Sequence, residues 1–126
     1  MNQDCENARY IYDENSLKLV KTAIATVAAS QTDSSVVAAV AGKRIKVVSY
    51  QLIGQGTSNT ITFNSKPAGA GAAITPTYSV PATNAIAVPY SPKGHFQTVA
   101  GEGLTVTTGA TASNLGVLVN YIQAEA

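Results

Sequence analysis

The sequence predicts an all-β protein: an antiparallel β-sandwich, jelly-roll-like, with an extended N-terminal arm. Several segments alternate between apolar and small polar residues with the period of two that a half-buried strand shows. Clusters of Gly, Pro, Asn, Ser and Thr separate these segments about every ten residues, a spacing typical of sandwiches and jelly rolls. No segment has the length and charge pattern of an amphipathic helix.

Charge divides the chain into an arm, residues 1–16, and a sandwich domain, residues 17–126. The acidic residues Asp4, Glu6, Asp13 and Glu14 all lie in the arm, whereas the rest of the chain is sparsely charged. A polar segment ahead of a compact body is typical of chains that become ordered on a partner. We therefore expect the arm to dock on a neighbouring subunit or on a larger assembly.

About seven or eight short strands are predicted. The first, 18–29, also has apolar residues at helical spacing, but its Thr and β-branched content favours a strand. Two segments, 45–53 and 115–122, carry apolar residues on both faces. This pattern predicts central strands that are covered on both sides, or strands whose second face meets another subunit. The predicted strands are 18–29, 45–53, 60–64, 85–90, 103–107 and 115–122.

Segment 85–90 alternates with a period of two and contains a proline. It places Ile86, Val88 and Tyr90 on one face. Pro89 cannot donate a hydrogen bond to a neighbouring strand. The sequence therefore predicts that this segment is an edge strand or that the strand ends at Pro89.

Composition argues against several classes of partner. Hydrophobic residues make up 45% of the 126 residues and charged residues 12%, which argues against a disordered acidic or basic tail. The net charge of +1 provides little of the electrostatic attraction that non-specific nucleic-acid binding requires. No apolar run approaches the ~20 residues of a membrane-spanning helix, and no secretory signal pattern begins the sequence. We expect no nucleic-acid or membrane partner and synthesis in a cytoplasm.

The residues that could carry chemistry are few. One cysteine and one histidine cannot form a disulfide framework or a Cys/His zinc site. As a general base, His95 would need a nucleophile and an orienting acid, but the sandwich domain has only Asp33, Glu102 and Glu125 as carboxylates. Glu102, between two glycines, is typical of a turn. We expect no enzyme activity, no cofactor and no metal site.

Protein contacts are the better positive expectation. Tyr10, Ile11 and Tyr12 in the arm suit interface anchors. The basic residues Lys43, Arg44 and Lys46 could meet an acidic partner or could block edge-to-edge aggregation, and the sequence leaves both readings open. His95 and Phe96, beside a turn, complete the candidate interface residues. Because so few charges oppose self-association, we expect a homo-oligomer, most simply a trimer.

Four segments carry a resemblance to a known group of proteins. They are 38–47 (AAVAGKRIKV), 89–98 (PYSPKGHFQT) and 101–104 (GEGL), together with the final strand 115–122. Over about residues 17–124 the chain resembles small all-β proteins encoded among tailed-phage virion genes. These include capsid decoration, or cement, proteins, which are β-sandwich trimers on the outside of the head.

The resemblance implies a virion protein of the outer capsid surface that bridges subunits of the major capsid protein. The alternative is a tail or fibre protein, or a surface module that binds a ligand such as a glycan. That alternative would use the loops 54–59 and 92–96.

Overall fold

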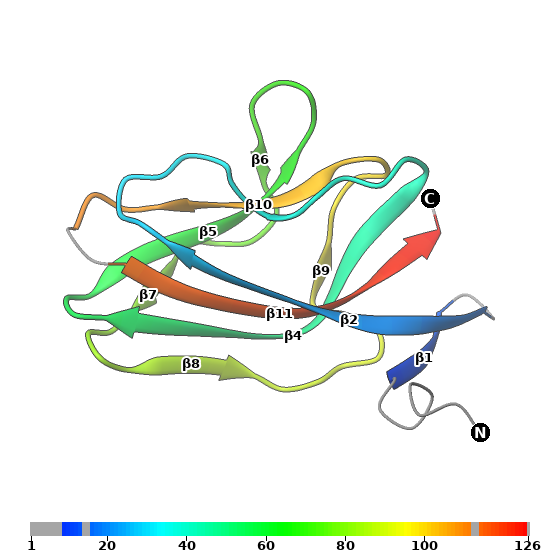
Figure 1. Cartoon of the computed structure of the whole chain (residues 1–126), viewed down its shortest axis with the longest axis horizontal. Coiled ribbons are helices and arrows are strands. Elements are labelled where there is room, and N and C mark those ends of the chain that lie inside the picture. Colours follow the sequence, from blue (N-terminus) through cyan, green and yellow to red (C-terminus); the bar gives the residue numbers. More distant parts are fainter. Residues whose placement is uncertain (1–8, 14–15, 112–113, 126) are drawn as a thin grey trace.

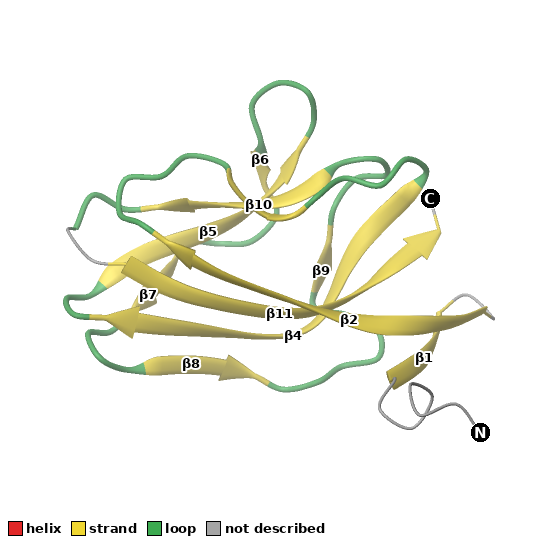
Figure 2. Ribbon diagram, in the orientation of Figure 1, coloured by secondary structure: helices red, strands yellow, loops and turns green. Residues whose placement is uncertain are grey.

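The computed structural model describes residues 9–13, 16–111 and 114–125, which form strands and loops without any helix. Two antiparallel sheets face each other and enclose the core, as Figures 1 and 2 show. The larger sheet has the order β1 (Arg9–Asp13), β2 (Ser16–Val27), β11 (Asn114–Glu125), β4 (Lys43–Gln55), β8 (Ala85–Val88), and β9 (Phe96–Gln97) also pairs with β4. The smaller sheet has the order β3 (Ser34–Val37), β10 (Gly103–Thr108), β5 (Asn59–Lys66), β6 (Ala72–Ala73), and β7 (Tyr78–Val80) also pairs with β5. The predicted all-β antiparallel sandwich is confirmed.

The strands, singly or in short runs, alternate between the two sheets along the chain, and the jelly-roll arrangement stays a prediction. The chain passes back and forth between the sheets, so that β2, β11, β4 and β8 lie side by side in one sheet and β3, β10, β5 and β7 in the other. Almost every strand pair therefore joins segments that are distant in the sequence. The two-layer arrangement buries one face of each sheet and leaves the opposite face outward.

The six strands that the sequence locates, of the seven or eight it predicts, are all present, including β2, for which a helix was the alternative. The structure has more strands than predicted. Four of the additional ones, β3, β6, β7 and β9, have four residues or fewer, which is too short to show an alternating pattern. Pro89 marks the end of a strand as expected, because β8 ends at Val88 on the edge of the sheet. Tyr90 then departs from the predicted face and is 53% exposed.

The core between the sheets is centred on aromatic residues. The ring of Phe63 on β5 lies 4.9 Å from that of Phe96 and 5.6 Å from that of Tyr50, measured between centroids. Aliphatic residues from both sheets surround these rings, including Leu52 and Val119, which are completely buried. Aromatic packing of this kind, edge-on between Phe63 and Tyr50 and tilted between Phe63 and Phe96, adds to the free energy gained from apolar burial.

The predicted central strands are central. β11 lies between β2 and β4, and β4 lies between β11 and the short strands β8 and β9. An irregularity in the pairing, where Asn120 is opposite Ser49 and Tyr121 is opposite Val47, leaves Val48 as an extra residue. Val48 therefore joins a second, smaller apolar cluster with Ile122, Ala124 and Val20, separate from the main core.

Residues 9–13, within the predicted arm, form β1 and pair with β2 from Arg9 opposite Val20 to Asp13 opposite Ser16. β2 pairs with β11 only between Lys21 and Val27. The first part of β2 and all of β1 thus extend beyond the paired region as a β-hairpin, seen at the right of Figure 1. Residues 1–8, the remainder of the arm's N-terminal part, lie outside the described residues.

Candidate interaction surface

The outward face of the larger sheet carries no charged side chain over its central part. We call this surface the outer face patch. It is formed by alternate residues of four neighbouring strands, whose intervening residues point into the core. The patch comprises Thr22, Ile24, Thr26, Ser49, Gln51, Ile53, Ala85, Ala87, Gly116, Leu118 and Asn120.

Two large aliphatic side chains of the patch are strongly exposed. Ile24 is 77% exposed and Ile53 is 41% exposed. Isoleucine is among the residues most often buried in folded proteins. Leu118 stands opposite Ile24 on β11 and is partly buried. Exposed aliphatic residues that gather on one uncharged face, rather than being scattered singly, are typical of a surface that contacts another protein.

Hydrogen bonds across three strands fix the polar end of the patch. Thr22 Oγ1 donates to Asn120 Oδ1 at 2.5 Å, and Asn120 Nδ2 donates to Ser49 Oγ at 2.7 Å. The amide of Asn120 is therefore held in place from both sides. A surface with fixed side chains loses little conformational entropy when a partner covers it.

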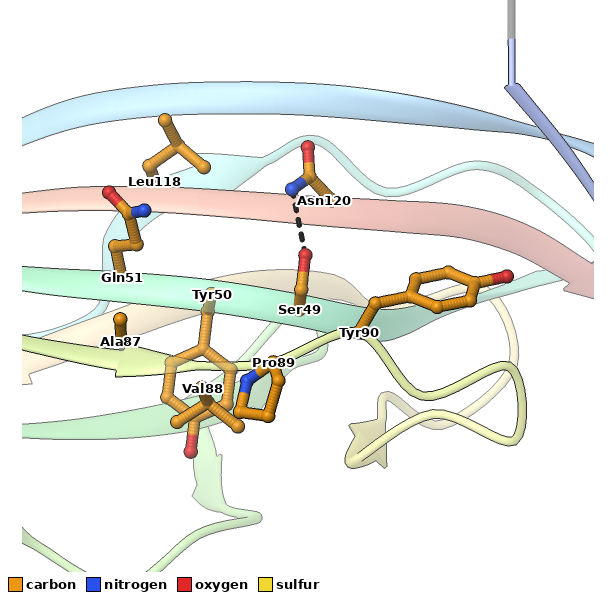
Figure 3. A pocket seen from close by; sticks show the side chains of 9 residues that line it. All are labelled: Ser49, Tyr50, Gln51, Ala87, Val88, Pro89, Tyr90, Leu118 and Asn120. Atoms are coloured by element: carbon orange, nitrogen blue, oxygen red, sulfur yellow. Dashed lines mark hydrogen bonds between the residues drawn. The ribbon is translucent and has the colours of Figure 1, made fainter.

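A shallow hollow of about 300 Å³ lies at the edge of this patch. Figure 3 shows the side chains of Ser49, Gln51, Leu118 and Asn120 standing on one side of the sheet, while those of Tyr50 and Val88 point to the other. The exposed ring of Tyr90 forms part of the wall. The lining residues are Ser49, Tyr50, Gln51, Ala87, Val88, Pro89, Tyr90, Leu118 and Asn120.

A second hollow, of about 240 Å³, is basic. Its lining contains Lys46 and Lys93, with Gly94, His95, Phe96 and Gln97. Gly94 has a φ of +80°, and a Cβ there would lie 2.6 Å from Cγ of Lys46. The turn can therefore pack against Lys46 only because residue 94 is glycine. This hollow holds three of the predicted interface residues, Lys46, His95 and Phe96.

His95 and Phe96 are engaged within their own chain. The backbone N–H of His95 donates to the carbonyl of Val47 at 2.8 Å, and its Nε2 lies 2.8 Å from the carbonyl oxygen of Pro89. Because a carbonyl can only accept, Nε2 carries the proton in this contact. Phe96 packs against the core cluster. Their possible part in an interface stays a prediction, and the intramolecular contacts already give both residues a structural role.

The predicted basic triplet is divided among different contacts. Lys43 Nζ lies 2.7 Å from Glu125 Oε1, and Lys18 Nζ lies 2.8 Å from the same oxygen. Hydrogen bonds from Lys18 and then Lys43 lower the pKa of Glu125 to about 2. Arg44 Nη1 donates to the carbonyl of Thr98 at 3.3 Å. Thus part of the positive charge of this triplet, for which the sequence left both a partner contact and protection from aggregation open, is balanced inside the chain.

Of the predicted arm residues, Tyr10 is 49% exposed. It lies on β1 directly opposite Leu19 of β2. The side chains of Ile11 and Tyr12 lie outside the part of the chain that is described. Tyr10 is not among the residues that line the basic hollow.

Two carboxylates of the sandwich domain belong to structural networks. Glu102 Oε1 accepts a hydrogen bond from Ser65 Oγ at 2.7 Å, in the turn where the sequence placed it. Asp33 Oδ1 accepts from Asn64 Nδ2 and Thr105 Oγ1, and its Oδ2 accepts from the N–H of Gly71. Among the described residues, no three His, Cys, Asp or Glu side chains gather as metal ligands would. The same residues form no helix that could cross a membrane.

Comparison with known proteins leaves the family open. Neither the models of protein families nor the curated proteins give a match. One solved structure, described as Bacillus endospore appendages that form a family of disulfide-linked pili, has 20% sequence identity and a TM-score of 0.42. The match covers 90% of this chain and 95% of the other. At this identity and TM-score, the similarity establishes neither a shared topology nor a shared function.

Proposed function

We propose that this chain is a structural subunit of a phage virion: a capsid decoration protein that oligomerises, as a trimer, and stabilises the head by bridging major capsid protein subunits. It would be located on the outer capsid surface. The sequence segments 38–47, 89–98 and 101–104 provide the resemblance to virion proteins. The structural observation that carries the proposal is the outer face patch.

The patch suits contact with a protein better than contact with water. Its exposed aliphatic side chains, Ile24 and Ile53, lie among small neutral residues on a sheet, which provides a broad and firm surface. Burying apolar area contributes roughly 25 cal/mol per Å². An oligomer that presents several such patches would bind a lattice of capsid subunits through linked contacts, so that modest single affinities multiply.

Binding to heads tests the proposal directly. The purified chain is mixed with heads that lack it and sedimented, with Ile24→Glu as the test variant and Val99→Glu as the matched control. Val99 is 52% exposed but lies outside the patch. We expect the unchanged chain and Val99→Glu to sediment with heads and to raise their resistance to heat, and Ile24→Glu to do neither. Heads that bind none of the three proteins, or bind all three equally, would contradict the proposal.

The hollow beside Tyr90 supports a second candidate, a surface module that binds a glycan. An exposed tyrosine ring next to the side chains of Ser49, Gln51 and Asn120 offers both a stacking face and hydrogen-bonding groups. The loops that the sequence suggests for this role, 54–59 and 92–96, lie apart: the former begins with the last two residues of β4, Gly54 and Gln55, whereas Phe96 pairs with Val47 near the beginning of β4. Saturable binding on a glycan array that Tyr90→Ala abolishes would favour this candidate.

A further inference from the structure

The β1–β2 hairpin has two faces of different character. On one face, Val20 packs against the cluster of Val48, Ile122 and Ala124, and Lys18 pairs with Glu125. That face therefore rests on the end of β11. Because side chains alternate along a strand, Leu17 and Leu19 point to the opposite face. Tyr10, directly opposite Leu19 on β1, shares that face with them.

The second face of the hairpin is apolar and uncovered. Leu17 is 56% exposed, Leu19 is 40% exposed and Tyr10 is 49% exposed. Three large apolar side chains thus stand together on a segment that extends beyond the paired sheet. The chain's own body is engaged with the other face of the hairpin, so it leaves this one open. A partner molecule is required to remove these side chains from water.

Charge indicates which partner fits. Residues 1–16 contain four acidic residues and one basic residue, a formal charge of −3. Residues 17–126 contain seven basic and three acidic residues, a formal charge of +4. The arm is therefore attracted to a surface with the charge of residues 17–126, and a second copy of the chain offers such a surface. The basic hollow at Lys46 and Lys93 is one place on that body where positive charge gathers.

We propose that the apolar face of the β1–β2 hairpin, formed by Tyr10, Leu17 and Leu19, docks on the body of a second copy of this chain and holds the oligomer together. This inference rests on the proposed function only in that both assume an assembling subunit. It assigns a different surface to a different partner: the hairpin joins copies to one another, and the outer face patch meets the capsid. Each copy gives one arm and receives another, which allows a closed ring.

The solution mass of the full chain, measured by light scattering over a range of concentrations, tests the inference. The test variant is Leu17→Ser with Leu19→Ser, and the matched control is Val99→Ser, which removes an exposed aliphatic side chain that lies outside both the hairpin and the outer face patch. We expect the unchanged chain and Val99→Ser to associate alike and the double variant to associate at least tenfold more weakly. Raising NaCl from about 50 mM to about 500 mM should also weaken association, because salt screens the arm from the body.

Two further measurements keep the result interpretable if the double variant alters the hairpin itself. Tyr10→Ser removes the third apolar side chain from the other strand and should weaken association in the same direction. In the unchanged chain, amide hydrogen exchange of residues 9–20 should slow as concentration rises. An unchanged mass for both variants, a monomeric unchanged chain, or exchange that is independent of concentration would overturn the inference.

The two proposals fail separately. If the hairpin variants keep the oligomer while Ile24→Glu loses head binding, the inference about the hairpin is wrong and the capsid proposal stands. If the hairpin variants become monomeric while no protein binds heads, the inference stands and the capsid proposal is wrong.

Discussion

The phenol oxygens of Tyr50 and Tyr78 lie 2.9 Å apart, which joins β4 of the larger sheet to β7 of the smaller one. Tyr50 also packs edge-on against Phe63, Phe96 and the ring of His95. Burial and then the hydrogen bond with Tyr78 raise the pKa of Tyr50 well above its ordinary value of 10.0. This pair is a polar link between the two layers of the sandwich.

Tyr50→Phe should lower the free energy of unfolding by about 1 kcal/mol, because it removes the hydrogen bond and leaves the ring in place. Tyr78→Phe is the matched change on the other partner. Since both remove the same bond, the double variant should lose less than the two single losses added together. Urea unfolding of the four proteins measures this coupling, and strict additivity would show that the two hydroxyl groups act independently.

The same pair predicts behaviour in alkali. A group whose pKa is higher in the folded protein contributes stability that is complete below its unfolded value, here 10.0, and is lost as pH rises towards the folded value. The unchanged chain should therefore lose stability more steeply than Tyr50→Phe above about pH 10. Tyr121, whose pKa burial also raises, remains in both proteins and cancels in the comparison. Equal slopes in urea unfolding at several alkaline pH values would contradict this assignment.

The backbone of the loop after β7 lies close to the sheet at Gly54 of β4. A Cβ at this position would lie 2.1 Å from the carbonyl oxygen of Pro81. Gly54→Ala should therefore cost about 1–3 kcal/mol of stability, because strand or loop must move. At Gly69 a Cβ would meet nothing within 4 Å, so Gly69→Ala should change stability by less than about 0.5 kcal/mol. Thermal or urea unfolding compares them, and equal losses would refute the argument.

Asp33 joins three separate segments through one carboxylate. Asp33→Ala should cost about 2–3 kcal/mol, because the buried groups of Asn64 and Thr105 lose their acceptor. The φ of residue 33 is +52°, a conformation that Asn tolerates better than Ala does. Asp33→Asn, which keeps one acceptor oxygen, should therefore cost only about 1 kcal/mol. If urea unfolding gives the two variants the same stability, the acceptor is not what matters.

The ion pairs of Glu125 predict that the protein loses stability at low pH. Its pKa is lowered from 4.5 to about 2 by Lys18 and Lys43. A carboxyl with a lowered folded pKa contributes stability that is present above the unfolded value and is lost as pH falls through the folded one. Between pH 4.5 and about 2, the unchanged chain should lose more stability than Glu125→Gln. The Glu125 side chain is 48% exposed, so the difference should shrink in high salt, and a difference that persists there would contradict an ionic origin.

Alternation and turn chemistry were sufficient to predict the sandwich, because both are local. β4, β5 and β11 could be located from their own residues alone. The register between strands could not. At Val47 and Val48 two consecutive residues are both buried, one in the main core and the other in the second cluster, because the pairing with β11 is irregular there. The alternation of apolar and polar residues along a strand does not reveal such a bulge.

The candidate interaction surface, like the fold, could be predicted from the sequence only in part. The scarcity of charge in residues 17–126 was visible in the sequence and indicated protein contacts. Which residues share a face was not, because Thr22, Ser49 and Asn120 meet only through the order of three strands. The ion pair of Lys43 with Glu125, 82 residues away, likewise could not be predicted from the sequence, which left the role of Lys43 open. For the hairpin a signal existed: Tyr10 and Tyr12 alternate just before a strand.

The order of the strands in the larger sheet also determines when that sheet can fold during synthesis. β11 lies between β2 and β4 in space yet follows both of them along the chain. Until the ribosome has translated β11, β2 and β4 lack the strand that lies between them in the finished sheet. Their edges on that side are unpaired, and the core face of the sheet is incomplete. The larger sheet can therefore form completely only late in synthesis. Long-range pairings of this kind also slow folding. During that interval the unpaired edges of β2 and β4 are the part of the chain most in need of protection from other nascent copies.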